Sequence, residues 1–234
     1  MPGDKVLVLG GTGPAGICLL RELVHRNRAA IVYARNPTKV PSELADHPLL
    51  EIVEGEMGDL EALSTAMARS SVVVSLLGPQ ISDRNVGPSL YADMYKNSIF
   101  PLMRQHGVRR IFAMGTVSIQ RAEDSWTMLQ FTIVCFMKLL AGVLYQNIIN
   151  VANTFDRDAD GIDWTVYRIA HIPGEPDHES WKKDRDSGEA LACWVGQKGW
   201  SSTIKRAVLA KWLVDGAEGK ADEWVRKMPA ISGT

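Results

Sequence analysis

The sequence lacks a cysteine framework. Its three cysteines, Cys18, Cys135 and Cys193, are odd in number, far apart and without a C-x-x-C spacing. We therefore expect neither a set of disulfides nor a zinc or other metal site. Each cysteine is expected to be a small buried apolar residue in a reducing compartment.

An excess of charge is also missing, because 26 Lys and Arg residues face 27 Asp and Glu residues and the formal net charge is −1. The basic residues are scattered, so nothing indicates a nucleic-acid partner. The first residues, "MPGDKVLVLGG", contain no basic segment followed by an apolar one, so no cleaved signal peptide is expected. We predict a cytoplasmic protein.

One long apolar run is present, from Trp126 to Leu144, with Lys138 as its single charge in 19 residues. That length could span a bilayer. The alternative is a buried crossover helix at a subunit contact or over a lipophilic pocket. A predicted strand precedes the run and another follows it, and a membrane span would separate the two strands. We therefore predict a crossover helix, no membrane span, and a homodimer that partly buries its apolar face.

Short Val- and Ile-rich runs alternate with longer amphipathic ones. Strands are predicted at 5–10, 29–34, 50–55, 71–78, 109–115 and 163–170, and helices near 14–26, 59–69, 87–106 and 126–158. Several of the strand runs lack polar alternation, as expected for strands buried on both faces. This alternation predicts an α/β fold of the Rossmann type, with a doubly wound parallel sheet.

After residue 170 the pattern changes. The segment 171–189 is rich in Pro, Gly and charge and is expected to be a loop, and "ALACWVGQKGW" is expected to form one or two strands. The segment 201–219 is expected to be a capped helix that Gly219 ends. We expect a single domain over 1–234, with 171–234 as its small C-terminal portion on the substrate side.

Glycines follow the first predicted strand in the sequence "GGTGPAG". Gly10, Gly13 and Gly16 have the G-x-x-G-x-x-G spacing between a strand and a helix. One glycine would permit a tight turn, one would let the backbone approach a pyrophosphate, and one would let helix and strand pack closely. The helix N-terminus would supply amides and a positive dipole to the phosphates. The alternative is a purely structural turn.

An arginine stands at the end of the second predicted strand. Arg35 follows Gly16 by 19 residues, at the position where NAD-binding folds place an Asp or Glu on the ribose hydroxyls. A guanidinium there can pair with a 2′-phosphate, and Lys39 and the Asn36 amide could complete the pocket. The alternative is a solvated arginine. We predict NADP(H) rather than NAD(H).

Two further segments fit the same ligand. Asp59 follows the third strand, where its side chain can reach the adenine amino group or cap the next helix. Leu77 and Gly78 end the fourth strand, where the backbone can run beside the adenosine ribose. The full set of predicted cofactor residues is Gly10, Thr12, Gly13, Pro14, Ala15, Gly16, Arg35, Asn36, Lys39, Gly58, Asp59, Leu77, Gly78 and Thr116.

With these residues the sequence resembles the atypical short-chain dehydrogenase/reductases. It is most similar to the NmrA-like and NAD(P)H-binding group, which includes flavin and biliverdin-B reductases. The matching segments are "GGTGPAG", "YARNPTK", "GD" at 58–59, "HGVRRIFAMGTVSI", "DGIDWTVYRIAHI" and "IKRAVLAKWLVD". The segment "LYQNIINVANTF" with its preceding apolar run is similar to fungal members, some of them encoded beside secondary-metabolite genes. The resemblance implies fold and cofactor more specifically than reaction.

The sequence departs from the larger superfamily at the catalytic pair. Reductases of that superfamily use Tyr-x-x-x-Lys, but here no tyrosine is followed four positions later by lysine. The candidate catalytic groups are Thr116 and Ser118 at the end of the fifth strand, Tyr145 on the crossover helix, and His171 after the sixth strand. The hydroxyls could bind a substrate carbonyl or cap the following segment. Tyr145 and His171 could supply a proton, or be an ordinary helix tyrosine and a loop histidine.

Three functions remain open at this level. The favoured one is an NADP(H)-dependent oxidoreductase that acts on a lipophilic, polycyclic aromatic or polyketide-like small molecule. The others are a non-catalytic regulator that senses NADP and a redox-neutral isomerase or dehydratase that retains NADP. The missing lysine weakens the first and leaves the other two, because fold alone does not fix function.

Overall fold

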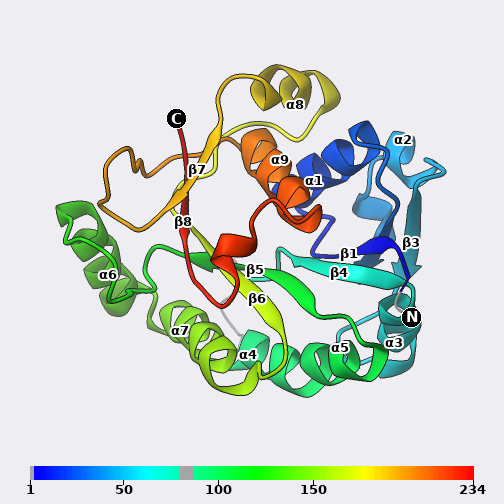
Figure 1. The fold of residues 1–234 in the computed structure, drawn as a ribbon, viewed down its shortest axis with the longest axis horizontal. Coiled ribbons are helices and arrows are strands. Elements are labelled where there is room, and N and C mark those ends of the chain that lie inside the picture. Colours follow the sequence, from blue (N-terminus) through cyan, green and yellow to red (C-terminus); the bar gives the residue numbers. More distant parts are fainter. Residues whose placement is uncertain (1–2, 80–86) are drawn as a thin grey trace.

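A computed structural model describes residues 3–79 and 87–234 as one eight-stranded sheet between two layers of helices (Figure 1). The strand order is β3-β2-β1-β4-β5-β6-β8-β7. The first six strands are parallel to their neighbours, β8 is parallel to β6, and β7 alone is antiparallel. This confirms the predicted Rossmann-type α/β fold.

The first six strands follow the apolar runs that were predicted as strands from the sequence. Their bounds are β1 Lys5–Leu9, β2 Ala30–Ala34, β3 Leu50–Glu54, β4 Ser70–Ser75, β5 Arg110–Thr116, β6 Asp163–Ile169, β7 Ala190–Cys193 and β8 Ala230–Gly233. β1 and β2 are buried almost throughout, which explains why they show no polar alternation. β4 ends at Ser75, earlier than predicted, so Leu77 and Gly78 lie in the loop that follows it.

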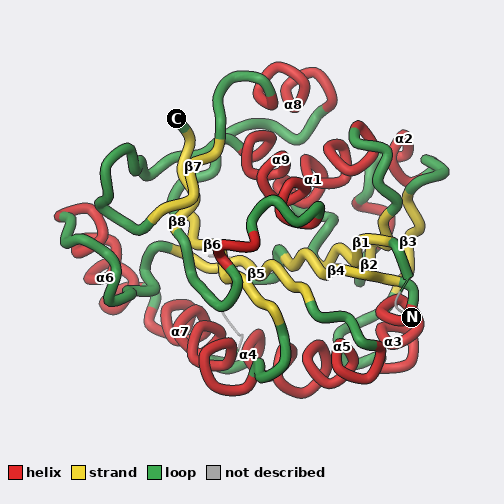
Figure 2. Tube along the Cα trace, in the orientation of Figure 1, coloured by secondary structure: helices red, strands yellow, loops and turns green. Residues whose placement is uncertain are grey.

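The helices cover both faces of the sheet (Figure 2). Helices α1 (Pro14–His25), α8 (His178–Arg185) and α9 (Arg206–Ala217) lie on one side, and α3 (Leu60–Ala68), α5 (Phe100–His106) and α7 (Gly142–Asp158) on the other. Two apolar clusters result, one under α1 and α9 and the other under α3, α5 and α7. The short helix α2 (Ser42–Ala45) and the 3-10 turns η1 (Pro37–Lys39) and η3 (Asp222–Trp224) connect these elements.

The predicted helix near 87–106 is present, but its geometry changes along its length. It comprises α4 (Leu90–Met94), a π-helical turn η2 (Tyr95–Ile99) and α5. Pro101 explains the change, because a proline inside a helix lacks the amide that an α-helical hydrogen bond needs. Gly107, with φ +71°, ends α5 in the left-handed conformation that favours glycine.

The prediction of one crossover helix over 126–158 is wrong. Two helices occupy this segment, α6 (Met128–Leu140) and α7, bent by 118° at Ala141 and Gly142. Within the described ranges no single helix is long and apolar enough to cross a membrane, whereas α6 and α7 taken together pass a test of length and composition. The Thr127 side chain caps α6 by accepting from the Gln130 amide at 3.1 Å.

The segment after residue 170 contains more regular structure than predicted. The expected loop includes α8, and β8 was not predicted at all. The segment 190–200 forms only β7, and the helix expected over 201–219 begins at Arg206 without a side-chain cap. β7 and β8 both extend the main sheet, so the C-terminal portion contributes two of its strands.

Candidate cofactor and substrate site

The glycine loop lies at the point where the chain order of the sheet reverses. β1 has β2 on one side and β4 on the other, which is where folds of this kind bind ligands beyond the carboxyl ends of the strands. Gly10 adopts φ +80°, in the left-handed region that favours glycine. A Cβ atom on Gly10 would lie 3.1 Å from the Leu76 carbonyl, so the loop directly abuts the end of β4.

Gly13 and Gly16 differ in what surrounds them. A Cβ atom on Gly16 would lie 2.5 Å from the Gly10 carbonyl oxygen, so glycine is needed there for packing. A Cβ atom on Gly13 would meet only that same oxygen, at 3.9 Å. Nothing in the described protein requires a glycine at 13, whereas a pyrophosphate approaching the loop would. This space fits the predicted phosphate group.

The N-terminus of α1 presents amides on the same side. Gly13 is its N-cap residue and supplies no side-chain acceptor, and Pro14 at the first helical position has no amide to satisfy. The amides of Ala15 and Gly16 follow without a side-chain cap, and Thr12 lies half-buried beside them. Uncapped amides and the helix dipole together make a site for an anion.

Arg35 directly follows β2 and is exposed. No carboxylate within residues 3–79 and 87–234 pairs with it. Lys39, on η1, is also exposed. The Asn36 side-chain carbonyl accepts from the Thr38 amide at 3.1 Å and from the Thr38 hydroxyl at 2.6 Å, which fixes the turn after the arginine. Two cations without a described partner therefore stand beside the strand that neighbours the glycine loop.

Asp59 has a structural role at the start of α3. Its carboxylate accepts from the Ala62 amide at 3.0 Å and caps the helix. Gly58 and Asp59 are both exposed, and a Cβ atom on Gly58 would meet nothing within 4 Å. The capping role leaves the second carboxylate oxygen for another donor, so the adenine contact stays a prediction.

A small cavity lies between the ends of β4 and β5 and helix α7. It is lined by Leu77, Gly78, Pro79, Met114, Gly115, Thr116, Ile148 and Val151. Of the predicted residues, the structure thus brings Leu77, Gly78 and Thr116 together. The sequence did not single out Met114, Ile148 or Val151, which give the cavity its apolar walls.

Thr116 and Ser118 form a hydroxyl pair at the end of β5. Their side-chain oxygens are hydrogen-bonded to each other, and the Ser118 amide donates to Thr116 Oγ1 at 3.3 Å. Ser118 is buried, whereas Thr116 is half-buried and lines the cavity. Thr116 is therefore the hydroxyl of the pair that is open to the cavity, and Ser118 contacts Thr116 from the buried side.

Tyr145 and His171 are not part of the cavity lining. Tyr145 lies one helical turn before Ile148 on α7, half-buried, and the Lys138 ammonium lies 5.6 Å from its ring centroid. His171 is exposed after β6, and its backbone pairs with the segment 202–204. In the described structure, neither residue is hydrogen-bonded to the Thr116 side chain.

Two other tyrosines have structural roles near the site. The Tyr95 hydroxyl shares a hydrogen bond of 2.6 Å with Ser75 Oγ, and the Tyr167 hydroxyl donates to the Ser75 carbonyl at 3.1 Å. Both rings are fully buried, and burial raises the pKa of each phenol above its ordinary value. These phenols fix the end of β4 and are not suited to releasing a proton.

A buried ion pair that the sequence did not reveal is hydrogen-bonded to the backbone of the segment that carries the hydroxyl pair. Arg168, on β6, binds Asp124 through two hydrogen bonds of 2.6 and 2.7 Å. Asp124 also accepts from the Val195 amide at 3.0 Å and from Gln130, whose side chain donates to the Val117 carbonyl at 2.9 Å. This network connects α6, the segment after β5 and the C-terminal portion. The ion pair could have been suspected from Arg168, because a charged residue inside a strand that is predicted to be buried needs a partner.

Burial alone would raise the pKa of Asp124, but the hydrogen bonds and charge of Arg168 outweigh burial and lower it. Cys18 and Cys193 are buried as predicted, and burial raises the pKa of Cys18 to about 11. Cys135 is only half-buried, so its prediction as a core residue is wrong. Among the described residues, no cluster of His, Cys, Asp and Glu could hold a metal ion.

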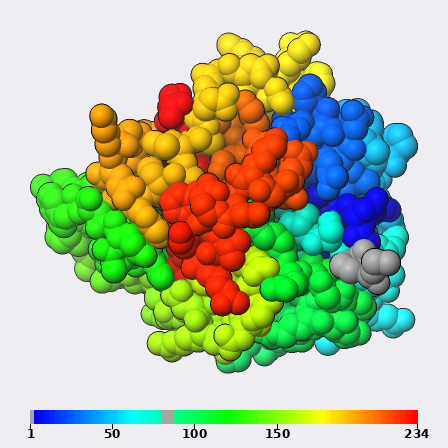
Figure 3. All heavy atoms as spheres, viewed as in Figure 1, coloured from blue at the N-terminus to red at the C-terminus, as the bar shows by residue number. Residues whose placement is uncertain are grey.

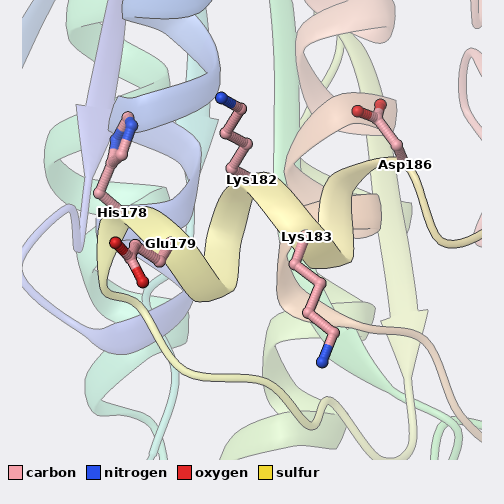
Figure 4. A pocket seen from close by; sticks show the side chains of 5 residues that line it. All are labelled: His178, Glu179, Lys182, Lys183 and Asp186. Carbon is pink, nitrogen blue, oxygen red and sulfur yellow. The ribbon is translucent and has the colours of Figure 1, made fainter.

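A second hollow lies on α8, lined by His178, Glu179, Lys182, Lys183 and Asp186 (Figure 4). The five side chains leave the helix in opposite directions and do not converge on a common point. Four of them come from the eight-residue helix α8, and Asp186 directly follows it. We interpret it as open surface.

The sheet order, the glycine loop and the helix N-terminus together define a dinucleotide-binding protein of the Rossmann class. The chain belongs to the NAD(P)H-binding family, whose model matches residues 10–219. That range starts at the first glycine of the loop and ends beyond α9. No curated protein sequence is similar enough to the chain to count as a match.

Solved structures confirm the fold. A wide-type short-chain dehydrogenase/reductase from Veillonella parvula, in complex with NADP, is 16% identical with a TM-score of 0.74, covering 98% of this chain and 94% of that chain. The oxidoreductase ylbE from Lactococcus lactis is 14% identical with a TM-score of 0.68, covering 98% and 91%. ChuY, an anaerobillin reductase from Escherichia coli O157:H7, is 12% identical with a TM-score of 0.67, covering 97% and 96%. Oxidoreductases thus share this architecture over nearly the whole chain.

Proposed function

We propose that the protein is an NADP(H)-dependent reductase of a lipophilic small molecule. The observation that carries the proposal is Arg35, an exposed guanidinium at the end of β2 beside a glycine loop that leaves space for a pyrophosphate. A 2′-phosphate at the second strand would find a fork of donors in Arg35 and a further cation in Lys39. The adenosine ribose would lie along Leu77 and Gly78.

NADPH, when bound, supplies a hydride, and the protein supplies position and electrostatics. Thr116 would donate a hydrogen bond to the acceptor oxygen, and Ser118 would hold the Thr116 hydroxyl in place. The side chains of Leu77, Met114, Ile148 and Val151 would exclude water beside it. The aliphatic wall is the reason to propose a lipophilic acceptor, such as a polycyclic aromatic or polyketide-like molecule.

Among the described residues, those that line the cavity offer no acidic group to donate the proton. The α7 residues that line it are Ile148 and Val151, so a proton would reach the product from water or from Tyr145 or His171 at the margin. This favours acceptors whose reduced form is a delocalised anion, because such an anion does not require an acid in contact with it. Quinones, flavins and extended aromatic ketones have this property.

The test is oxidation of NADPH, followed by its absorbance, against a panel of quinones, flavins and aromatic ketones. A Gly13→Asp variant is the matched control, since its carboxylate would occupy the phosphate position. Turnover by the wild type that the variant lacks supports a reductase. Tight NADPH binding with no turnover on any acceptor would instead favour a regulator that senses NADP, or a redox-neutral enzyme.

We further propose that the chain is a single domain that works in the cytoplasm. The continuity of the sheet from β3 to β7 supports one domain, because the C-terminal portion adds strands to the same sheet. Two fragments of the protein that fold independently when expressed separately would contradict this.

A further inference from the structure

Helix α6 is apolar on both sides, and the described protein covers only one of them. Gln130, Ile133, Val134 and Met137 face the protein. The opposite side, with the residues that flank it, is here called the α6 face. It consists of the exposed residues Trp126, Met128, Leu129, Phe131, Phe136, Leu139, Leu140 and Val143 together with Thr132 and Cys135. A helix that is apolar all round is normally buried all round.

The size of the α6 face is unusual for a monomer. Its eight large apolar residues are between 42% and 82% exposed. At roughly 200 Å² for a large apolar side chain, they present about 1,000 Å² of surface. The largest apolar patch on a typical monomer is about 300–600 Å². A stable protein–protein interface buries about 800 Å² on each partner, so two α6 faces are sufficient for one.

The face extends from the body of the molecule. In Figure 3 the green atoms of this segment form the left edge, and Figure 1 shows α6 there, apart from the two helical layers. A second molecule could therefore approach α6 without meeting the helices that cover the sheet.

The residue pattern of the face fits another helix. Leu129, Thr132, Phe136 and Leu139 follow the i, i+3, i+7, i+10 spacing of a helix–helix seam. The polar member of the seam does not need water, because the Thr132 hydroxyl donates to the Met128 carbonyl at 2.9 Å. The seam can therefore be buried without leaving an unsatisfied hydroxyl.

The charge on α6 favours a protein partner over lipid. Lys138 is the only charged residue on the helix, and its ammonium lies against the Tyr145 ring at the margin of the face. Helices that lie on membranes usually carry several Lys or Arg residues on their polar side, and α6 does not. A face without charge also pairs with its own copy without repulsion.

We propose that a second copy of this chain covers the α6 face, with the two α6 helices packed antiparallel across a two-fold axis. Thr132 and Cys135, the small residues near the middle of the face, lie at the crossing point and let the helices approach closely. The large residues at each end of one helix then pack against those at the opposite end of the other. Because α6 leads directly into α7, the dimer also supports the helix that carries Ile148 at the cavity.

The first test is the oligomeric state in detergent-free buffer at micromolar concentration. Sedimentation velocity of the wild type should give twice the chain mass of 25.8 kDa. Leu139→Glu should give a monomer, because a dimer would have to bury the new carboxylate in the apolar seam. Leu60→Glu, at an exposed leucine on α3, is the matched control and should remain a dimer.

Circular dichroism establishes that each variant is folded, and Phe136→Glu provides a second disruption of the face at a separate position. A monomeric wild type overturns the proposal. So does a dimer that persists in both Leu139→Glu and Phe136→Glu, because the interface would then lie elsewhere.

The second test uses the natural cysteine at the crossing point. Mild oxidation with copper phenanthroline, which removes two electrons and two protons from the thiol pair, should join Cys135 of one copy to Cys135 of the other through a disulfide and give a covalent dimer on a non-reducing denaturing gel. Cys135→Ser should give none, since Cys18 and Cys193 are buried. No cross-link in the wild type, or one that persists in Cys135→Ser, contradicts the antiparallel crossing.

Flotation with phosphatidylcholine vesicles tests the alternative that the α6 face binds lipid and not a second copy of the chain. The dimer should remain at the bottom of the gradient. Wild-type protein that floats with the vesicles, and loses this in Leu139→Glu, would mean that the face binds lipid and would overturn the proposal.

Discussion

Gly13→Asp should raise the stability of the protein and abolish its cofactor binding. Gly13 is the N-cap of α1, with φ −82° and ψ 166°, and its helix has no side-chain cap. Asp is among the most favourable N-cap residues and would accept from an amide of the first turn. A Cβ atom at this position meets nothing closer than 3.9 Å, so the new side chain adds no clash.

The expected gain is about 1 kcal/mol, from the cap and from the lower entropy of the unfolded chain once glycine is replaced. For a chain of this size that corresponds to a rise in Tm of about 2–4 °C. The same carboxylate would occupy the anion site with the wrong charge. NADPH binding, measured by isothermal titration calorimetry, should therefore become undetectable while Tm rises.

Two further variants separate the site from the fold. Gly16→Ala should lower stability by about 1–3 kcal/mol, because its methyl group would lie 2.5 Å from the Gly10 carbonyl oxygen. Gly142→Asp adds the same carboxylate at an open position at the start of α7 and should leave NADPH binding intact. Wild-type affinity for NADPH in Gly13→Asp would refute this account of the glycine loop.

Three other predictions concern the hydroxyl pair, the proton and the buried ion pair. Thr116→Val combined with Ser118→Ala should lower kcat more than it raises KM in steady-state kinetics on the identified substrate, because the pair acts on the developing oxyanion; a pure KM effect would contradict this. Tyr145→Phe should retain measurable turnover in the same assay, and a dead variant with intact cofactor binding would show that the phenol is essential. Asp124→Asn should lower the free energy of unfolding in urea by about 3–5 kcal/mol, because Arg168 would lose its buried partner. The pKa of Asp124 is lowered in the folded state, so the ionised carboxylate stabilises the protein at neutral pH, and this stabilisation is lost as the pH falls through the lowered pKa. The difference in free energy of unfolding between the wild type and Asp124→Asn should therefore shrink in acid. A difference that does not change with pH would contradict the ion pair.

The six parallel strands were predictable because each is a short, mostly apolar run, and all of them except the edge strand β3 are buried over most of their length. The glycine loop was predictable for a different reason, since its spacing depends on local backbone geometry. Arg35 could be placed at the cofactor edge because parallel strands bring their carboxyl ends to one side of the sheet. Each of these features is determined by residues that are close together in the sequence or by the regular geometry of a parallel sheet.

What the sequence did not predict depends on distant partners or on weak periodicity. α8 has Trp181 as its single buried residue, so it shows no apolar stripe, although the Asp177 cap and the basic last turn were readable. β8 is short and pairs with strands far away in the chain. Arg168 and Asp124 are separated by 44 residues, and nothing local connects them.

The break between α6 and α7 had one local signal, Gly142, inside an otherwise continuous apolar run. The composition of that run predicted burial, which the structure provides on one side of α6 only. Only part of the lining of the cavity beside Thr116 was predicted. Its strand residues follow from the sheet, whereas Ile148 and Val151 depend on how the bend orients α7.

The most direct test of the central claim is the affinity of the wild type and of Arg35→Ala for NADPH and for NADH, measured by calorimetry under the same conditions. Arg109→Ala is the matched control, because this exposed arginine directly precedes β5 and so lies at the amino ends of the parallel strands, away from the glycine loop. The account predicts that the wild type prefers NADPH and that Arg35→Ala weakens NADPH by about 1.5–3 kcal/mol, the range for a hydrogen bond to a charged group, with little change for NADH. A wild type that prefers NADH, or equal losses for both cofactors in Arg35→Ala, would contradict it.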